Sequence, residues 1–128
     1  MASTLKLNTL TGASTAGSIA VTGEGNSTTT NLQQGLAKYW TQFNGTGTVA
    51  TQDSFNQGGL TDNGTGDYTT SFTNNMNNDD YATGFGCNTG EPEVHTLATS
   101  SIRMNALNSS GSNNDKSIIS YGILGDLA

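Results

Sequence analysis

The sequence predicts an all-β fold, an antiparallel β-sandwich of the jelly-roll-like kind. Short runs in which apolar and polar residues alternate recur along the chain, whereas the spacing of an amphipathic helix is nearly absent. Clusters rich in Asn and Gly separate these runs, and such clusters favour turns. Many short strands between frequent turns are typical of a sandwich or a barrel.

The 128-residue chain divides on this pattern into an arm and one folded domain. Residues 1–34 hold two short strand candidates, at 4–10 and 18–21, and a polar connector at 22–34. They bury little of themselves, so we expect them to lie on another surface. Residues 35–128 carry the other strand signals and form the expected sandwich domain.

The strands expected in this domain follow one another at short intervals. Lys116–Leu124 is the most apolar of them, and Gln57–Gly59 would interrupt the second as a bulge or bend. Pro92 is expected in a loop, where it breaks no strand pairing. The expected strands are 35–43, 46–55, 67–72, 81–87, 94–99, 101–107 and 116–124.

The tetrapeptide NGTG occurs twice, at 44–47 and 63–66, and predicts two hairpin turns. Asn-Gly is the preferred centre of a type I′ turn because both residues accept positive φ. Two-residue turns at Asn44–Gly45 and Asn63–Gly64 would join three strands into a meander. A glycine-rich phosphate cradle is disfavoured, because no G-x-x-x-x-G-K-[ST] motif occurs and no helix pattern follows either cluster.

Pairing across these two turns predicts which face of the meander is buried. Trp40 would lie opposite Val49, and Phe55 opposite Phe72, so the large side chains share one face. The predicted core face consists of Leu36, Trp40, Val49, Phe55, Tyr68 and Phe72. Two other aromatic residues, Tyr39 and Tyr81, are then the surface candidates for contact with a sugar or a protein.

The charge balance excludes several classes of partner. Four Lys and Arg stand against ten Asp and Glu, which gives a net charge of −6. Nucleic acid binding requires cations that replace the counterions of phosphates, and anionic membranes require the same. The start MASTLKLNTL has no apolar leader segment and no run could span a bilayer, so we expect synthesis in the cytoplasm.

No catalytic or cofactor-binding arrangement emerges, and the sequence predicts a protein that is not an enzyme. The single histidine, His95, lacks a G-x-S-x-G partner motif. Glu91 and Glu93 flank Pro92, and two acids on one loop more often solvate that loop than cleave glycosides. Cys87 has no cation nearby and no Cys/His cluster around it, so it is expected to be a small core residue.

Calcium binding is left open by the sequence. Asp62, Asp67 and the cluster at 77–80 offer oxygen ligands, but none of them matches D-x-[DN]-x-[DN]-G. Turn formation is the favoured role of these residues, and no metal site is predicted.

The run KYWTQFNGTGTVATQDSFNQGGLTDNGTGDYTTSFTNNMNNDDYATGF, at 38–85, resembles a module of virion proteins of tailed bacteriophages, especially marine ones. That module varies on W-x-x-F-N-G-T-G-T-V, then S-F-N, then T-D-N-G-T-G-D-Y-x-x-x-F, with a Met and an Asp-rich turn before a Tyr. The closing SIISYGILGD is similar to its last strand. Gln52–Asp53 and Gln57–Gly59 depart from the usual pattern.

The resemblance implies a non-enzymatic structural protein on the virion surface, β-rich and homotrimeric. Both a head decoration or cement protein and a fibre or appendage subunit fit, so head and tail locations stay open. Residues 1–34 would anchor the domain to another capsid or tail protein, because so short an arm suits direct docking. A fibre tip that binds a receptor or a surface glycan is the alternative function.

Overall fold

The computed structural model describes residues 4–13, 19–23 and 28–128. The chain forms two compact units, Met1–Gly35 and Leu36–Ala128, which we call the arm and the head. The division falls one residue after the boundary expected from the sequence.

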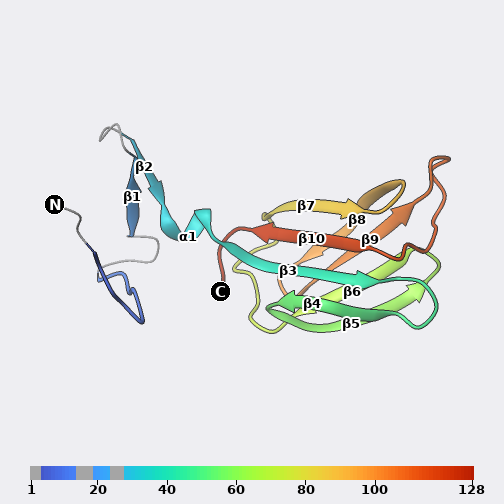
Figure 1. Ribbon diagram of the computed structural model, residues 1–128, viewed down its shortest axis with the longest axis horizontal. Coiled ribbons are helices and arrows are strands. Elements are labelled where there is room, and N and C mark those ends of the chain that lie inside the picture. Colours follow the sequence, from blue (N-terminus) through green and yellow to red (C-terminus); the bar gives the residue numbers. More distant parts are fainter. Residues whose placement is uncertain (1–3, 14–18, 24–27) are drawn as a thin grey trace. The chain divides into compact units, whose positions relative to one another are not determined.

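The arm contains one small antiparallel sheet and one helical turn (Figure 1). Strand β1 (Ala20–Thr22) pairs with β2 (Thr29–Asn31), and helix α1 (Leu32–Gly35) follows directly. The Asn31 side chain accepts a hydrogen bond from the Gln34 amide at 3.1 Å, which caps the start of α1. Local side-chain and strand contacts therefore account for the order in this unit.

The secondary structure of the arm, where it is described, differs from the prediction in three segments. The strand predicted at 4–10 is wrong, because all described residues from 4 to 13 lie outside regular structure and are exposed. The strand predicted at 18–21 begins outside the described residues, and β1 covers its end. The connector predicted at 22–34 holds β2 and α1, since its threonines form a strand when a partner is present.

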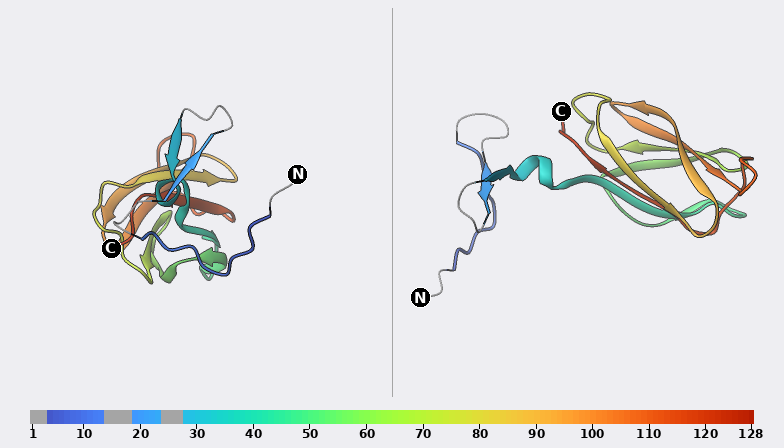
Figure 2. Two further views of the ribbon diagram at one scale, coloured as in Figure 1. Left: turned by 90° about the vertical axis from the view of Figure 1, so that its left-hand side faces the viewer. Right: turned by 90° about the horizontal axis from the view of Figure 1, so that it is seen from above.

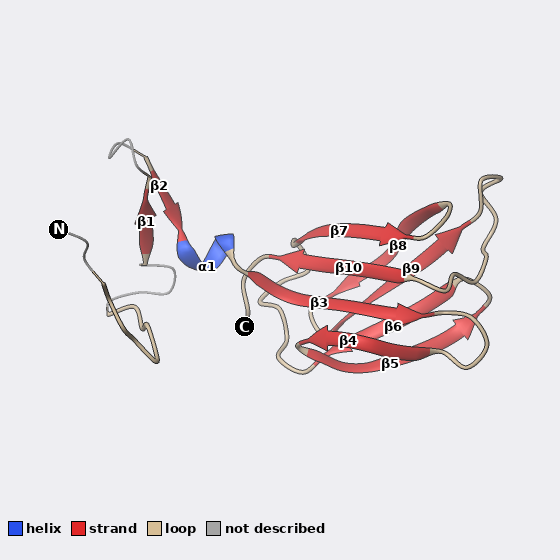
Figure 3. Cartoon of the chain, viewed as in Figure 1, coloured by secondary structure: helices blue, strands red, loops and turns tan. Residues whose placement is uncertain are grey.

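The head consists of strands joined by loops and turns (Figure 3). The strand at 94–99 proved to start earlier, so Pro92 lies within a strand and not in the predicted loop. That strand is at an edge of its sheet, where proline is tolerated. The strands are β3 (Ala37–Asn44), β4 (Ala50–Phe55), β5 (Gln57–Gly64), β6 (Asp67–Phe72), β7 (Ala82–Cys87), β8 (Glu91–Ala98), β9 (Ser101–Leu107) and β10 (Ile119–Leu124).

These strands form two four-stranded antiparallel sheets that pack as a sandwich, which confirms the predicted fold class (Figures 1 and 2). Sheet I has the order β4-β3-β10-β7, and sheet II has the order β5-β6-β9-β8. Eight strands in two sheets suit a jelly-roll-like sandwich, although the hairpins β3–β4, β5–β6 and β8–β9 each pair sequence neighbours within one sheet.

The core between the sheets is built largely from aromatic residues and methionine. Phe43 meets Tyr68 edge-on with ring centroids 5.2 Å apart, and Tyr39 meets Phe72 in the same way at 5.0 Å. Each such ring buries a large area, so few residues suffice in a chain that is only 32% hydrophobic. The buried cluster comprises Tyr39, Phe43, Tyr68, Phe72, Met76, Tyr81, Ile102, Met104, Ala106, Ile119, Tyr121 and Ile123.

The predicted core face is right for β6 and wrong for the two strands before it. Tyr68 and Phe72 are buried, and Val49 packs half-buried against the core. Trp40, by contrast, is 39% exposed, and Phe55 is 51% exposed. Leu36 precedes β3 and is exposed as well.

The first turn is longer than predicted, and the register of β3 against β4 differs accordingly. Asn44 pairs with Ala50, so five residues form the loop and not the predicted two. The Asn44 side chain accepts hydrogen bonds from the amide and hydroxyl of Thr46, which is a local Asx turn and opens the loop. A bulge between Gln42 and Phe43 then shifts the register by one residue, so Trp40 lies opposite Phe55. Both are on the outer face, and Tyr39 and Phe43 point inward.

The second turn is also displaced from its predicted place. Gly64 pairs with Asp67, so Thr65 and Gly66 are its central residues, and the expected centre Asn63–Gly64 belongs to β5. Gly66 has the positive φ, +64°, that the turn requires. The predicted pair of Phe55 with Phe72 is therefore wrong, since Gln57 lies opposite Phe72.

The predicted three-stranded meander is also wrong, because the chain leaves sheet I for sheet II at Asn56. This residue has a φ of +62°, which is costly for a side chain other than glycine. Its side-chain Nδ2 donates to the backbone carbonyls of Lys38 and Asn74 at 3.0 and 2.9 Å. Its Oδ1 accepts from the backbone amide of Asn74 at 2.7 Å. These bonds stabilise the corner, one residue before the bend expected at Gln57–Gly59.

Candidate functional site

The two NGTG turns are held by a hydrogen-bonded pair of residues, Tyr68 and Asp115, and are not a ligand site. The Tyr68 hydroxyl lies 2.9 Å from both the Gly45 carbonyl and the Asp115 carboxylate, and the same carboxylate accepts from the Gly66 amide at 2.7 Å. Burial, followed by the nearby Asp115, raises the pKa of Tyr68 above its usual value. The turn amides of Gly45 and Gly64 donate to Lys116 and Asp62, so three glycine amides already have partners.

One glycine in each NGTG motif is required by packing. A Cβ at Gly45 would lie 2.4 Å from the Tyr68 hydroxyl, and a Cβ at Gly66 would lie 2.4 Å from the Asn114 amide nitrogen. Gly45 and Gly66 therefore allow close approach of chain segments, whereas a Cβ at Gly47 or Gly64 would meet nothing within 4 Å.

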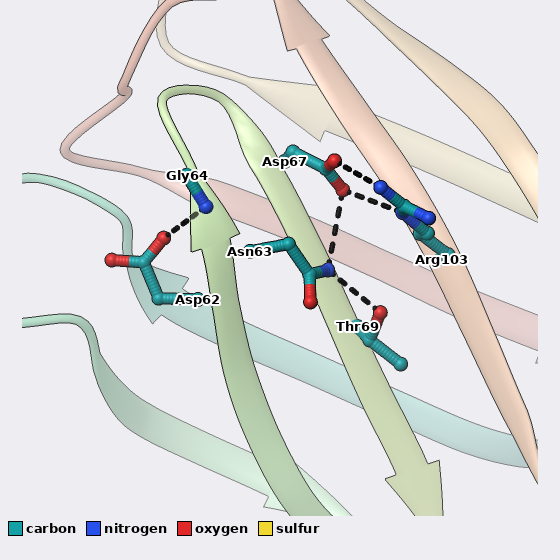
Figure 4. A network of polar contacts seen from close by, with 6 residues as sticks. All are labelled: Asp62, Asn63, Gly64, Asp67, Thr69 and Arg103. Carbon is teal, nitrogen blue, oxygen red and sulfur yellow. Dashed lines mark hydrogen bonds and ion pairs between the residues drawn. The ribbon is translucent and has the colours of Figure 1, made fainter.

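The outer face of sheet II carries a closed polar network (Figure 4). Arg103 donates to both carboxylate oxygens of Asp67, at 2.8 and 2.5 Å. The Asn63 amide donates to Asp67 at 3.2 Å and to Thr69 at 2.8 Å. The hydrogen bond from Arg103 lowers the pKa of Asp67. The side chains of this network thus bind one another across strands β5, β6 and β9.

Acidic and histidine residues from the sequence analysis do not form a site in the described part of the chain. Glu91, Glu93 and His95 are exposed on the edge strand β8. Among the residues that the structure describes, no group of three His, Cys, Asp or Glu side chains could hold a metal. Cys87 is half-buried against the core, and its thiol donates to the Thr89 carbonyl at 3.2 Å.

Both predicted surface tyrosines are core residues. Tyr39 is fully buried, and Tyr81 is 6% exposed with its hydroxyl donating to the Ala98 carbonyl at 3.0 Å. The reversed orientation of β3 turns Tyr39 inward and Trp40 outward. A contact surface built on these two tyrosines is therefore excluded for the folded head.

The outer face of sheet I instead carries a shallow groove of about 540 Å³. Trp40 on β3 lies beside Gly122 on β10, which in turn lies beside Gly84 on β7. The next row pairs Gln42 with Ser120 and Ser120 with Gly86. The groove is lined chiefly by Trp40, Gln42, Gly84, Gly86, Ser120 and Gly122.

The groove was not predicted from the sequence, because the predicted register assigned Trp40 to the core. Glycine inside a strand weakens the strand and often marks close approach of a ligand or another chain. Gly84, Gly86 and Gly122 interrupt otherwise regular strand patterns, and they are the signal in the sequence that could have indicated the groove.

Comparison with protein-family models, with curated proteins and with solved structures gives no match for the chain. Within the described residues, no helix combines the length and the apolar character needed to cross a membrane. The resemblance of residues 38–85 to a virion module therefore stays a prediction.

Proposed function

We propose that the chain is a non-enzymatic structural subunit on the surface of a bacteriophage virion, made in the host cytoplasm. Residues 1–34 dock on a capsid or tail protein, and the sandwich domain is the exposed part. The observation that carries this proposal is the exposure of apolar side chains along the arm. The resemblance of the head sequence to virion modules supports the same assignment.

Three leucines among the described residues of the arm have largely exposed side chains. Leu5 is 80% exposed, Leu7 is 54% exposed and Leu10 is 55% exposed. Burying one leucine side chain contributes about 1.5 to 3 kcal/mol, so a surface that covers all three gains substantial affinity. An apolar segment of this kind suits permanent attachment to a partner.

The two parts of the chain also differ in net charge. Residues 1–34 contain one lysine, Lys6, and one acid, Glu24, so they are neutral as a whole. The net charge of −6 therefore belongs to the head. An arm without net charge meets no long-range repulsion when it docks on another protein.

The head has the features of a passive, stable module. Its edge strand β8 carries Glu91, Pro92 and Glu93. Charged residues and proline at a sheet edge hinder pairing with a further strand. A core made from few residues favours association of several copies, and we propose the homotrimer that the resemblance implies.

The docking proposal is tested with virions that lack the protein. Purified full-length protein is added to such particles, and the bound fraction is measured by co-sedimentation. Wild type should bind to saturation, whereas the triple variant Leu5→Ser, Leu7→Ser, Leu10→Ser should not bind. Phe55→Ser, which changes an equally exposed apolar residue of the head, is the matched control and should bind normally.

Binding of the triple variant at wild-type level would overturn docking through the arm. Bound protein that raises the resistance of capsids to heat supports the cement role, and binding to purified tails supports the fibre role. A mass of three chains on the particle, or in solution by light scattering, tests the trimer.

A further inference from the structure

The groove on the outer face of sheet I is not explained by the structural role of the head. Glycine occupies three neighbouring positions on β7 and β10, in the middle of regular strand pairing. Glycine in a strand interior is destabilising, by about 0.5 to 1 kcal/mol relative to alanine. A protein that gains nothing from the open surface would be more stable with side chains there.

Local geometry does not demand these glycines. Gly84, Gly86 and Gly122 are not among the glycines with positive φ. A Cβ at Gly84 would meet no atom within 4 Å, and a Cβ at Gly122 would make only ordinary contacts, the nearest at 3.6 Å. A Cβ at Gly86 would lie 3.3 Å from the Ser120 hydroxyl, a tighter contact. The missing side chains leave a flat floor beside Trp40, and the backbone conformation does not demand glycine there.

The walls of the groove offer an aromatic plane and neutral hydrogen-bonding groups. Trp40 is 39% exposed at the edge of this floor. The side chains of Gln42 and Ser120 face the same groove, and within the described residues neither hydrogen-bonds to another side chain. No Asp, Glu, Lys or Arg is among the lining residues.

We infer that this groove binds a neutral saccharide. One face of a pyranose ring presents C–H groups that pack on an indole, while its hydroxyls accept and donate hydrogen bonds to amide and hydroxyl side chains. The volume lies in the range of small-molecule sites. Uncharged walls on a protein of net charge −6 disfavour anionic sugars.

The inference is independent of the docking proposal, because it concerns the head and its outer sheet face. Loss of saccharide binding leaves attachment to virions intact, and loss of attachment leaves saccharide binding intact. It also replaces Tyr39 and Tyr81, which are buried, with Trp40 as the aromatic contact of a surface glycan.

Trp40 is the single tryptophan of the chain, so intrinsic fluorescence reports directly on the groove. Full-length protein is titrated with neutral oligosaccharides of glucose, galactose, mannose and N-acetylglucosamine, and with an oligosaccharide of uronic acids. We expect saturable changes in Trp40 emission with at least one neutral sugar and none with the anionic one. Amide chemical shifts of Gly84 and Gly122 should move in the same titration.

Two variants remove the site by different means. Trp40→Ala removes the aromatic plane and should weaken binding, followed by chemical shifts, at least tenfold. Gly84→Val fills the floor and should weaken binding equally without lowering the melting temperature, because its side chain has open space. Phe55→Ala, beside Trp40 on the same face, and Ala82→Val, on the same strand as Gly84, are the matched controls and should keep wild-type affinity.

Three outcomes would overturn the inference. The first is absence of any saturable response to millimolar neutral sugars. The second is unchanged affinity in both Trp40→Ala and Gly84→Val. The third is loss of self-association in these variants without any sugar response, which would assign the groove to contact between copies of this chain.

Discussion

The head and the arm place their apolar residues in opposite ways. In the head, residues such as Phe43 and Ile123 are fully buried between two sheets. In the arm, Leu5, Leu7 and Leu10 are all more than half exposed. The head buries its apolar side chains within itself, whereas the described part of the arm leaves its leucines exposed, and this difference is the basis of the docking proposal.

The largest difference between head and arm is expected in their response to alkaline pH, because all four tyrosines of the chain belong to the head core. Burial raises the pKa of Tyr39, Tyr68, Tyr81 and Tyr121 above the usual value of 10.0. The folded head thus keeps protons that the unfolded chain releases, so the free energy of unfolding falls as the pH rises above about 10.

We expect cooperative unfolding in that range. Tyrosinate absorbance should rise and the circular dichroism signal should be lost in a single, shared transition. Ionisation of the four tyrosines near pH 10 in a head that stays folded would contradict the buried core.

The next effect concerns the two NGTG turns of the head. Gly47 and Gly66 have the same φ of +64°, but a Cβ at Gly47 meets nothing within 4 Å. Gly47→Ala should cost about 1 kcal/mol of unfolding free energy for the backbone conformation alone. Gly66→Ala should cost about 3 kcal/mol or more, because its Cβ would clash with Asn114 and Ala106. Urea denaturation measures both, and equal costs would rule out the close approach.

A smaller effect is expected at the corner between the sheets. Asn56→Ala removes three side-chain hydrogen bonds and should cost about 2 kcal/mol. Asn56→Gly removes the same bonds but accepts the positive φ, so it should be the less damaging of the two. If Asn56→Gly proves as stable as wild type, the hydrogen bonds contribute nothing and only the conformation matters.

A pH effect of modest size is expected on the outer face of sheet II. The hydrogen bond from Arg103 lowers the pKa of Asp67 below its ordinary value of 3.8. The contribution of Asp67 is therefore complete above that value and is lost as the pH falls through the lower folded-state pKa. Thermal melts between acid and neutral pH should show this loss in wild type and not in Asp67→Asn. Asp79→Asn, at an exposed site, should follow wild type.

The smallest effect is expected in the arm. The triple variant Leu5→Ser, Leu7→Ser, Leu10→Ser should change the unfolding free energy of the head by less than about 0.5 kcal/mol, as exposed substitutions do. Calorimetry of the free protein measures this change. A loss of several kcal/mol would show that the arm supports the head, and the comparison between the two would fail.

The fold class was readable from the sequence because alternation and turn residues are local signals. The burial of Tyr68 and Phe72 was readable for the same reason. The inward face of β3 was not, because it depends on a loop of five residues held open by Asn44 and closed by contact of Gly45 with Tyr68. That contact joins residues far apart in sequence, and Asn-Gly preference alone points to a shorter turn.

The groove shows the same limit. Its residues come from β3, β7 and β10, and only the order of strands in sheet I brings them together. Trp40 lies opposite Phe55 on the outer face only because the first turn is long and a bulge follows between Gln42 and Phe43, and neither feature was predicted. The glycines were visible in the sequence, but their common face was not.

Cryo-electron microscopy of purified virions tests the central claim most directly. The proposal predicts density for the sandwich on the outside of the particle, in groups of three, with Leu5, Leu7 and Leu10 buried against a capsid or tail protein. Particles without this chain, or a sandwich docked through its sheets while the arm extends into solvent, would contradict it.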